Sequence, residues 1–457
     1  MRHARFRGWG PSLAAALLFL AAPARAEFRA GAARRAITPD LKRFGPVYIA
    51  GFGQNRVATG VHDELAARCL ALSAGARPLV VCGVDSIGLY WDDVAGVRKA
   101  VVAADVIVAA THSHQTPDTM GLWGPSFGAS GINDDYNRFV VEQTGAAAVE
   151  AVRGMKPAVL RLASVNLPEL NGYFDDTRPP VVHDAEIVVL SVSARDGGAI
   201  GTLVNWANHP EALGSANTLL SADYLAYFYA QLERQLGGVA VFVNGAVGGM
   251  QSPLGAAITD PATGQPAPKN SFRFAEVLGA RVADLAAEAV KKAGPARIDR
   301  IEFRERLIHI PLTNEGFRIA AQAGLFKSRK SPNDDGTMTA PVGYLRLARG
   351  AKPLAEAALV PGEMYPELSV GGIQRYPGAD FPDAPLEPPL KKKMMRAPFR
   401  MLFGLANDEI GYIIPKAEWD QKQPWLRNAS KSWYGEVNSV GPDAAPRIAE
   451  ALRSLIR

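Results

Sequence analysis

Three histidines that end predicted strands are the residues of this sequence best suited to chemistry. His112 and His114 form a His-x-His pair directly after the apolar run 105–110, and His209 ends a second apolar run, 201–209. In extended backbone, residues two apart point to the same side, so both imidazoles of the pair can face one point. Neutral imidazole is a good zinc ligand, and a catalytic zinc site needs about three protein ligands. The pattern predicts a metal site, with hydrogen-bonded histidines at strand ends as the alternative.

A glycine-rich loop that contains a serine follows a third apolar run. The run 239–244 opens into Gly245-Ala-Val-Gly-Gly-Met-Gln-Ser-Pro, which includes Ser252. The carboxyl ends of parallel strands commonly build the ligand site of an α/β sheet. We therefore expect the histidines and this loop to meet at one edge. His62 and His183 lie in no comparable pattern, and we interpret both as structural.

The elements that must position these residues form an α/β pattern between about residues 61 and 310. Strands are expected at 67–72, 78–84, 106–110, 158–164, 186–192, 201–206 and 239–243. Helices are expected at 136–153, 221–236 and 275–292, the second with Ser221 as its N-cap. Such alternation predicts a mixed, largely parallel sheet flanked by helices.

After about residue 313 the regular alternation of predicted strands and helices ends. Segments 326–353 and 372–389 are predicted to be long surface loops, and 354–360 and 401–413 to be strands. Because neither a long helix nor an independent core is expected there, this part is predicted to be a C-terminal lobe (about 313–457) on the same domain as a core (about 27–312).

Residues 1–26 have the features of a secretory signal peptide. A basic start precedes the apolar run 13–22 and the cleavage pattern Ala24-Arg25-Ala26. The apolar run is too short to span a bilayer. We expect a soluble chain that begins near Glu27 and is exported to a periplasm or to the outside of the cell. Cys69 and Cys82 can pair in such a compartment, although two buried thiols fit the same pattern.

Composition and charge exclude several classes of protein. The 457 residues are 48% hydrophobic and 21% charged, which is typical of a folded domain and excludes a disordered or multi-span membrane protein. Lys and Arg total 50 against 45 acidic residues, but four arginines lie in the predicted leader. Without a concentrated basic face, nucleic-acid binding is not expected.

Segment 391–403 mixes cations with apolar residues, and we interpret it as a basic loop before a buried strand, with transient membrane-surface contact as the alternative.

Seven short motifs follow one another in an order typical of one enzyme family. They are Gly60-Val-His, His112-Ser-His-Gln-Thr-Pro, Asn205-Trp-Ala-Asn-His, Gly249-Met-Gln-Ser-Pro, Pro361-Gly-Glu, Gly404-Leu-Ala-Asn-Asp-Glu-Ile-Gly-Tyr and Tyr434-Gly-Glu-Val-Asn-Ser. In these motifs the chain resembles the neutral and alkaline non-lysosomal ceramidases, secreted or membrane-facing zinc amidases that cut the N-acyl bond of ceramide. The resemblance implies that residues 27–457 form one zinc hydrolase domain.

The resemblance also implies a role for each matched residue. These roles are one zinc ion per chain on His112, His209, Glu363 and Tyr412, a base at His114, and contacts of Ser252 and Tyr434 with the scissile amide. The implied reaction is hydrolysis of ceramide or a related N-acyl lipid amide by a zinc-activated water. Since zinc would already activate water, we favour Ser252 as a hydrogen-bond partner of the amide over Ser252 as a nucleophile.

Departures from the family pattern concern the substrate more than the chemistry. The family's Gly-Asp-Val-Ser-Pro is Gly-Met-Gln-Ser-Pro here, and because the sequence ends at Arg457 we expect it to lack the β-sandwich domain of full-length members. Other N-acylated amines therefore fit as well as ceramide. Two further hypotheses are a metal-independent serine hydrolase that uses Ser252 and a non-catalytic secreted protein that binds lipid.

Overall fold

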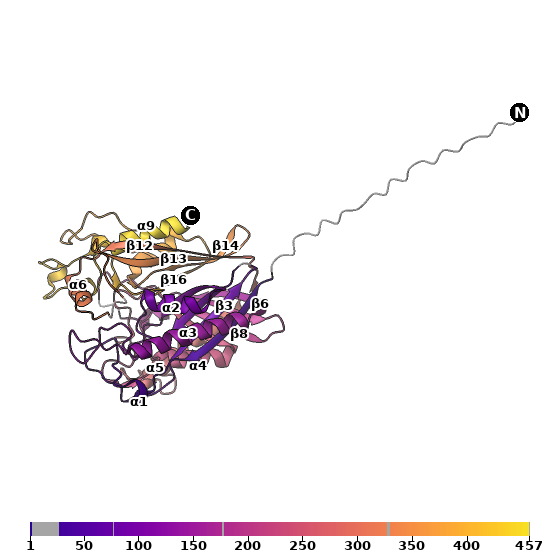
Figure 1. Cartoon of the computed structure of the whole chain (residues 1–457), viewed down its shortest axis with the longest axis horizontal. Helices are drawn as coiled ribbons and strands as arrows, with labels where there is room; N and C mark the ends of the chain where they lie inside the picture. The colour runs from indigo at the N-terminus through magenta and orange to yellow at the C-terminus, as the bar shows by residue number, and fades with distance from the viewer. Residues whose placement is uncertain (2–26, 76, 176–177, 327–329, 457) are drawn as a thin grey trace.

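The computed structural model describes residues 1, 27–75, 77–175, 178–326 and 330–456. Apart from Met1, the predicted signal peptide lies outside these residues. Two β-sheets pack face to face, and helices cover the outer face of each (Figure 1). The order of layers is α3, α4 and α5, then the large sheet, then the second sheet, and finally α9. None of the helices in the described ranges is long and apolar enough to cross a membrane.

The large sheet has the strand order β10-β8-β7-β6-β1-β3-β4-β5, with β11 paired to β6. Its strands are β1 (Arg29–Ala36), β3 (Ala66–Ser73), β4 (Leu79–Val84), β5 (Asp105–Ala110), β6 (Lys156–Val165), β7 (Ile187–Ala194), β8 (Ala199–Trp206), β10 (Val239–Asn244) and β11 (Pro295–Ala296). All seven predicted strands are present. β1, which lies between β6 and β3, was not predicted. Its Ala- and Arg-rich sequence lacks the usual strand signal.

The predicted mixed sheet flanked by helices is confirmed, but the expectation that it is largely parallel is wrong. Only β10–β8 and β4–β5 are parallel pairs, and the other pairs of this sheet are antiparallel. Short turns join β3 to β4 and β7 to β8, which allows antiparallel pairing, and β1 also enters antiparallel. The two parallel pairs are the ones that carry the histidine segments at their ends.

The predicted helices are α3 (Asp134–Arg153), α4 (Tyr224–Leu236) and α5 (Phe272–Lys292), and α2 (Trp91–Ala100) was not predicted. The N-cap of α4 is Asp223, not Ser221, as its carboxylate accepts a hydrogen bond from the backbone N–H of Tyr224. The same carboxylate accepts hydrogen bonds from the backbone N–H groups of Ala212 and Leu213. Ala212 is the third residue after His209. One buried group therefore caps the helix and holds the loop after β8.

The second sheet has the order β12-β13-β14-β16. Its strands are β12 (Arg300–Pro311), β13 (Thr337–Arg349), β14 (Lys352–Leu359) and β16 (Phe399–Phe403), and α9 (Ala444–Ile456) covers it. The expectation of a loop at 326–353 is wrong, because β13 is largely buried between two neighbouring strands. The predicted strand 401–413 divides into β16 and β17 (Tyr412–Ile413), and α9 is a long helix where none was expected.

Short elements complete the chain. They are α1 (Leu41–Phe44), β2 (Gly60–Val61), β9 (Leu219–Leu220), α6 (Glu315–Gln322), β15 (Glu363–Met364), α7 (Pro366–Val370) and α8 (Tyr434–Val437), with single turns at Pro168–Tyr173, Leu390–Met394, Lys416–Glu418 and Leu426–Asn428. Segment 372–389 contains no helix or strand, as predicted. The basic segment that begins at Lys391 leads into the strand β16, which agrees with its interpretation as a basic segment before a buried strand. Lys391 itself is buried and pairs with Asp184 at 2.8 Å.

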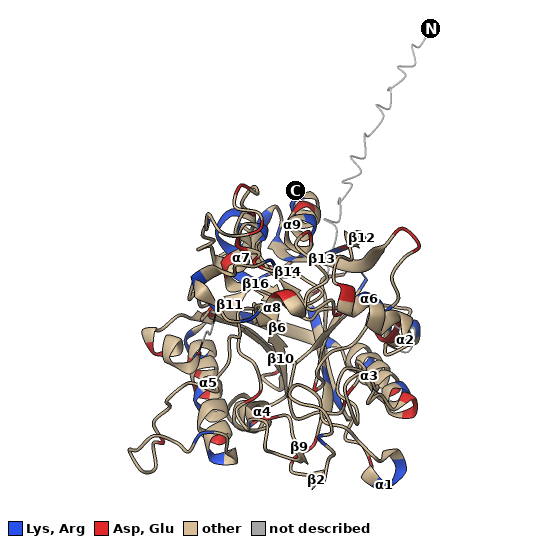
Figure 2. Cartoon of the chain, turned by 90° about the vertical axis from the view of Figure 1, so that its left-hand side faces the viewer, with Lys and Arg blue, Asp and Glu red and all other residues tan. Residues whose placement is uncertain are grey.

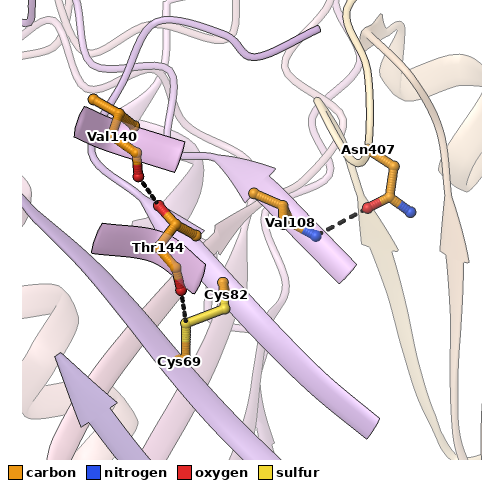
Figure 3. The surroundings of a disulfide bond; sticks show 6 residues. All are labelled: Cys69, Cys82, Val108, Val140, Thr144 and Asn407. Carbon is orange, nitrogen blue, oxygen red and sulfur yellow. Dashed lines mark hydrogen bonds between the residues drawn. A yellow bond between two sulfur atoms is a disulfide. The ribbon is translucent and has the colours of Figure 1, made fainter. Parts of the chain in front are cut away.

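A disulfide joins Cys69 to Cys82 between the paired strands β3 and β4 (Figure 3). The two cysteines are register partners, with their Cα atoms 4.1 Å apart, and both are fully buried. The carbonyl oxygen of Thr144 on α3 lies 3.9 Å from the Cys69 sulfur. The bond therefore fixes the hairpin beneath α3, and of the two alternatives the structure contains the paired one.

Replacing both cysteines with alanine should lower the free energy of unfolding by about 2 to 4 kcal/mol, because the bond restricts the unfolded chain across a short loop. Urea denaturation of the variant and of the oxidised wild type measures the difference. Titration of thiols in the wild type, unfolded in urea without a reductant, should find none. Two reactive thiols, or an unchanged denaturation midpoint, would contradict this prediction.

Candidate metal centre

The site forms where the two edges of the large sheet approach each other. β10 and β5 are the last strands at opposite edges, yet β10 packs against β3, β4 and β5. Gly83 on β4 allows this approach, because a Cβ atom there would lie 2.3 Å from the carbonyl oxygen of Phe242. The Asn244 side chain donates a hydrogen bond of 3.0 Å to the carbonyl of Thr111. The ends of β5, β8 and β10 therefore meet at one place, as the sequence predicts.

A segment of the C-terminal lobe, residues 404–407, closes the gap between these edges. The core and the C-terminal lobe are called the first and second lobes from here on. The backbone N–H of Gly404 donates to Asn244 at 3.0 Å, and the N–H of Ala110 donates to Leu405 at 3.2 Å. The Asn407 side chain accepts from Val108 at 2.9 Å (Figure 3). A side chain at position 404 would clash, because its Cβ would lie 2.4 Å from the Gly245 carbonyl oxygen. This segment therefore joins both lobes directly under the site.

The three histidines lie together, although not for the reason given by the sequence pattern. His112 follows the end of β5 and has a left-handed backbone (φ 67°), so the His-x-His segment is not extended. The ring centroid of His112 lies 4.9 Å from those of His114 and His209. One nitrogen atom from each of the three lies within 4.8 Å of the others, and all three residues are buried. A left-handed non-glycine residue of this kind is commonly found at functional sites.

Glu363 connects two of the histidines. Its Oε2 atom lies 3.1 Å from Nε2 of His209, and its Oε1 atom lies 3.5 Å from Nε2 of His112. The Nδ1 atoms of both rings bind backbone carbonyls, those of Ile87 at 2.6 Å and Gln251 at 2.9 Å. Each ring therefore donates through Nδ1 and presents Nε2 to the carboxylate, which is the arrangement that orients metal-ligating histidines.

Tyr412 lies beside Glu363 because the short strands β15 and β17 pair in parallel, with these two residues in register. Both side chains are buried, and the Tyr412 hydroxyl donates to the sulfur of Met250 at 3.3 Å. The resemblance named both residues, whereas neither has a recognisable pattern of its own. The second lobe therefore supplies the acidic and phenolic groups of the site, and the first lobe supplies the imidazoles.

The charges at the centre depend on one another. Burial opposes ionisation of Glu363, but the charges and hydrogen bonds of His112 and His209 hold its pKa well below the usual value. Burial also opposes a charged His209, yet the Glu363 hydrogen bond and the charges of Glu211 and Glu363 raise its pKa to about 9. Two imidazole nitrogens that face one buried carboxylate form a donor set suited to a zinc-like cation. The residues present therefore fit a metal ion.

His114 differs from the other two histidines in its surroundings. Burial and the charges of His112 and His209 hold its pKa well below the usual value, so its ring is neutral. Its Nδ1 atom lies 3.2 Å from the buried carboxylate of Glu211, a residue that the sequence analysis missed. The only sequence signal for Glu211 is its position two residues after His209.

Packing holds the His114 ring in place. The Phe52 ring contacts it edge-on, with centroids 5.0 Å apart. Gly51 is required here, because a Cβ atom at this position would lie 2.4 Å from the imidazole. The Arg56 guanidinium donates to the His114 carbonyl at 3.2 Å and to the Gln115 side chain at 2.8 Å. These contacts fix the ring beside, rather than between, Glu363 and its two histidines.

Ser252 and Tyr434 occupy different positions relative to this centre. Ser252 is buried, and its hydroxyl accepts a hydrogen bond from the backbone N–H of Leu254 at 3.1 Å. Within the described residues, no hydrogen bond joins this hydroxyl to a histidine. Tyr434 is 57% exposed, and its ring centroid lies 5.7 Å from that of Tyr412. Tyr434 therefore stands at the opening of the site, and Ser252 stands behind it, next to the Gln251 carbonyl that binds His209.

A small apolar cavity adjoins the centre. Its volume is about 70 Å³, and His112, Glu363, Tyr412 and Tyr434 form one of its walls. The other walls are mainly apolar, with Tyr90, Met120, Trp123, Phe317, Phe326 and Ile410 among them. Glu409 also lines it, and burial together with the nearby Glu363 charge holds the pKa of Glu409 well above its usual value. Burial thus favours the protonated form of Glu409, and the cation Lys330, which also lines the cavity, pairs with the buried Asp408.

His62 and His183 lie against aromatic rings instead. His62 stacks on Phe272 with centroids 3.6 Å apart, and His183 lies 5.1 Å from Phe174. In the described ranges neither is in a group of metal-binding side chains. Both positions agree with a structural interpretation.

Solved structures with the same architecture are enzymes of the family that the motifs indicated. The chain matches neutral ceramidase from Pseudomonas aeruginosa with a TM-score of 0.68 and 17% identity, over 94% of this chain and 74% of that one. This protein has the neutral ceramidase fold. A structure described as ceramidase complexed with C2 has the same fold, with a TM-score of 0.67, 16% identity, and coverage of 94% and 75%. No protein-family model and no curated protein matches the sequence. The resemblance to the ceramidases is therefore confirmed by the fold.

Replacing Glu363 with Gln should weaken metal binding by at least about a hundredfold, because loss of an outer-shell partner alone costs about 10- to 100-fold. Competition with a chromophoric chelator measures the affinity for Zn²⁺. Glu409→Gln is the matched control, since a glutamine resembles the protonated form of that side chain. Equal zinc affinities of the two variants would remove Glu363 from the metal site.

Proposed function

We propose that this protein is a zinc-dependent amidase that hydrolyses the N-acyl bond of ceramide or of a related N-acyl lipid amide. The observation that carries the proposal is the Glu363 carboxylate held between Nε2 of His209 and Nε2 of His112, next to a separate, neutral His114. One zinc ion would be held by His112, His209, Glu363 and Tyr412. Bound there, zinc supplies a Lewis acid that polarises the amide carbonyl and lowers the pKa of water.

His114 is assigned the proton transfers. A neutral imidazole can accept a proton from the attacking water and then donate it to the leaving amine, as general acid–base catalysis requires. Glu211, 3.2 Å from Nδ1, would orient the ring and stabilise the imidazolium while it carries that proton. His114 is therefore better placed as the base than as a ligand, since Glu363 contacts the other two rings.

Tyr434 is assigned to the substrate. Its position at the opening allows its hydroxyl to donate a hydrogen bond to the carbonyl oxygen as negative charge develops there. Donors of this kind contribute about 3 to 4 kcal/mol in other hydrolases. Since Tyr412 is assigned to the zinc ion, Tyr434 is the phenol that remains for the amide.

The apolar cavity supports a hydrocarbon group on the substrate. Its walls are mainly aromatic and apolar, and the cation in its lining, Lys330, already pairs with Asp408. A volume of about 70 Å³ holds only a few carbon atoms, so a short acyl group fits without rearrangement. N-acyl amines with short acyl chains are thus the first substrates to compare with long-chain ceramide.

Export is also proposed. The support is the leader pattern before Glu27 together with the Cys69–Cys82 disulfide, because such bonds persist in oxidising compartments. The enzyme would then act in a periplasm or outside the cell.

The function is tested by comparing His112→Ala with His114→Ala in the purified chain. The first variant should lose both zinc and activity, and the second should keep about one zinc per chain and lose about 100- to 10,000-fold in kcat. Elemental analysis and hydrolysis of short- and long-chain N-acyl sphingosines provide the two readouts. Full activity after removal of zinc by a chelator would exclude the proposal, and zinc binding without hydrolysis of any N-acyl amine would favour a lipid-binding protein.

Ser252→Ala is expected to retain a rate within about tenfold of the wild type, because its hydroxyl binds a backbone N–H and no histidine. Steady-state kinetics of the variant measures kcat. A loss of more than about a thousandfold, with zinc content unchanged, would instead identify Ser252 as a nucleophile and restore the serine hydrolase hypothesis.

A further inference from the structure

A second cavity lies on the C-terminal lobe, away from the metal centre. Its volume is about 630 Å³, and it is bordered by β13, β14, the segment 388–396 and the end of α9. None of the residues assigned to the metal centre lines it. Figure 2 shows Lys and Arg together with Asp and Glu in the ribbon around α9 and α7.

Cationic side chains dominate the walls of this cavity. They are Arg304, Arg346, Lys393, Arg396 and Arg453. Lys393, Arg396 and Arg453 are exposed, and in the described part of the chain no carboxylate forms an ion pair with any of them. Three cations thus line one cavity without an ion pair in the described part of the chain.

The one carboxylate in the wall, Glu356, is already used inside the fold. Its Oε1 atom accepts from the Tyr344 hydroxyl at 2.5 Å. Its Oε2 atom accepts from the backbone N–H groups of Arg396 and Ala397 at 2.5 and 2.6 Å. These bonds direct the carboxylate to the backbone and hold the Arg396 segment beside the cavity. Glu356 therefore shapes the wall, and it forms no ion pair with the three cations in the described part of the chain.

The two remaining guanidiniums share a carboxylate outside the wall. Glu302 lies 2.8 Å from Arg304 and 3.6 Å from Arg346, and it also pairs with Arg300 at 2.6 Å. Arg304 donates to the Leu455 carbonyl at 2.9 Å as well, near the end of α9. These contacts hold the guanidiniums of Arg304 and Arg346 in fixed positions at the border of the cavity.

We propose that this cavity is a binding site for a phosphate group. A phosphate presents several acceptor oxygens and up to two negative charges, and arginine binds it through paired N–H donors. Met394 and Ile456 give part of the wall an apolar surface for the remainder of the ligand. The phosphate can belong to an anionic phospholipid or to a soluble phosphorylated compound, which share this chemistry. The inference rests on charge and shape alone and does not depend on the proposed amidase activity.

The test compares two triple variants of the full mature chain. Lys393→Gln, Arg396→Gln and Arg453→Gln remove the unpaired cations, and Lys42→Gln, Lys99→Gln and Lys292→Gln remove three exposed cations of the first lobe as a control of equal charge. Inorganic pyrophosphate, titrated by calorimetry at low salt, probes the soluble source. Co-sedimentation with vesicles of phosphatidylglycerol mixed with phosphatidylcholine, against phosphatidylcholine alone, probes the lipid source.

The cavity variant should bind at least about tenfold more weakly than the control to one of these probes, and added salt should weaken binding by the wild type. Loss of pyrophosphate binding would assign the site to soluble phosphates, and loss of binding to the anionic vesicles alone would assign it to lipid. Equal binding by the two triple variants, or no binding of either probe by the wild type, would overturn the proposal.

Discussion

The site depends on the contact between the two edges of the large sheet. An open sheet would leave the ends of β5 and β10 far apart, since they are its first and last strands. Here the sheet curls until β10 lies against β4, which Gly83 permits, and the segment 404–407 bonds to both edges. Backbone hydrogen bonds at the edges are then satisfied by another lobe instead of by water. The convergence of three histidines follows from this closure.

Buried charge is the second constraint, and most of the buried ionisable groups near the site form ion pairs. Glu363 lies between two histidines, Lys330 pairs with Asp408, and Arg178 pairs with Glu436 at 2.5 Å. An unpaired ion would be costly in such an interior, whereas a pair with satisfied hydrogen bonds is tolerated. Around the centre, the surroundings lower the pKa of Glu363 and raise the pKa of Glu409, although both are buried carboxylates. Their environments thus shift the two pKa values in opposite directions, although the residues lie only 46 positions apart in the sequence.

The sequence predicted the strands of the first lobe well, because each is a short apolar run bounded by turn residues. It did not predict β1, which consists of alanine, glycine and arginine, or β13, in which a proline and two threonines obscure a buried strand. The histidines were found from their positions at strand ends. Glu363 and Tyr412 came only from the family resemblance, since their proximity arises from a pairing of two-residue strands that no local pattern encodes. Glu211 was missed for a related reason: its meaning depends on where His114 lies in space.

The parallel pairing of β15 with β17 has a consequence for how the protein matures. It places the acidic half of the centre on a lobe that is synthesised after all three histidines. A chain that has completed only its first lobe therefore holds imidazoles without their carboxylate. Under the proposed function, tight capture of a metal ion would wait until the second sheet has docked, so a loaded centre would mark a finished molecule. For an exported protein, this order would separate translocation of the chain from the acquisition of its ion.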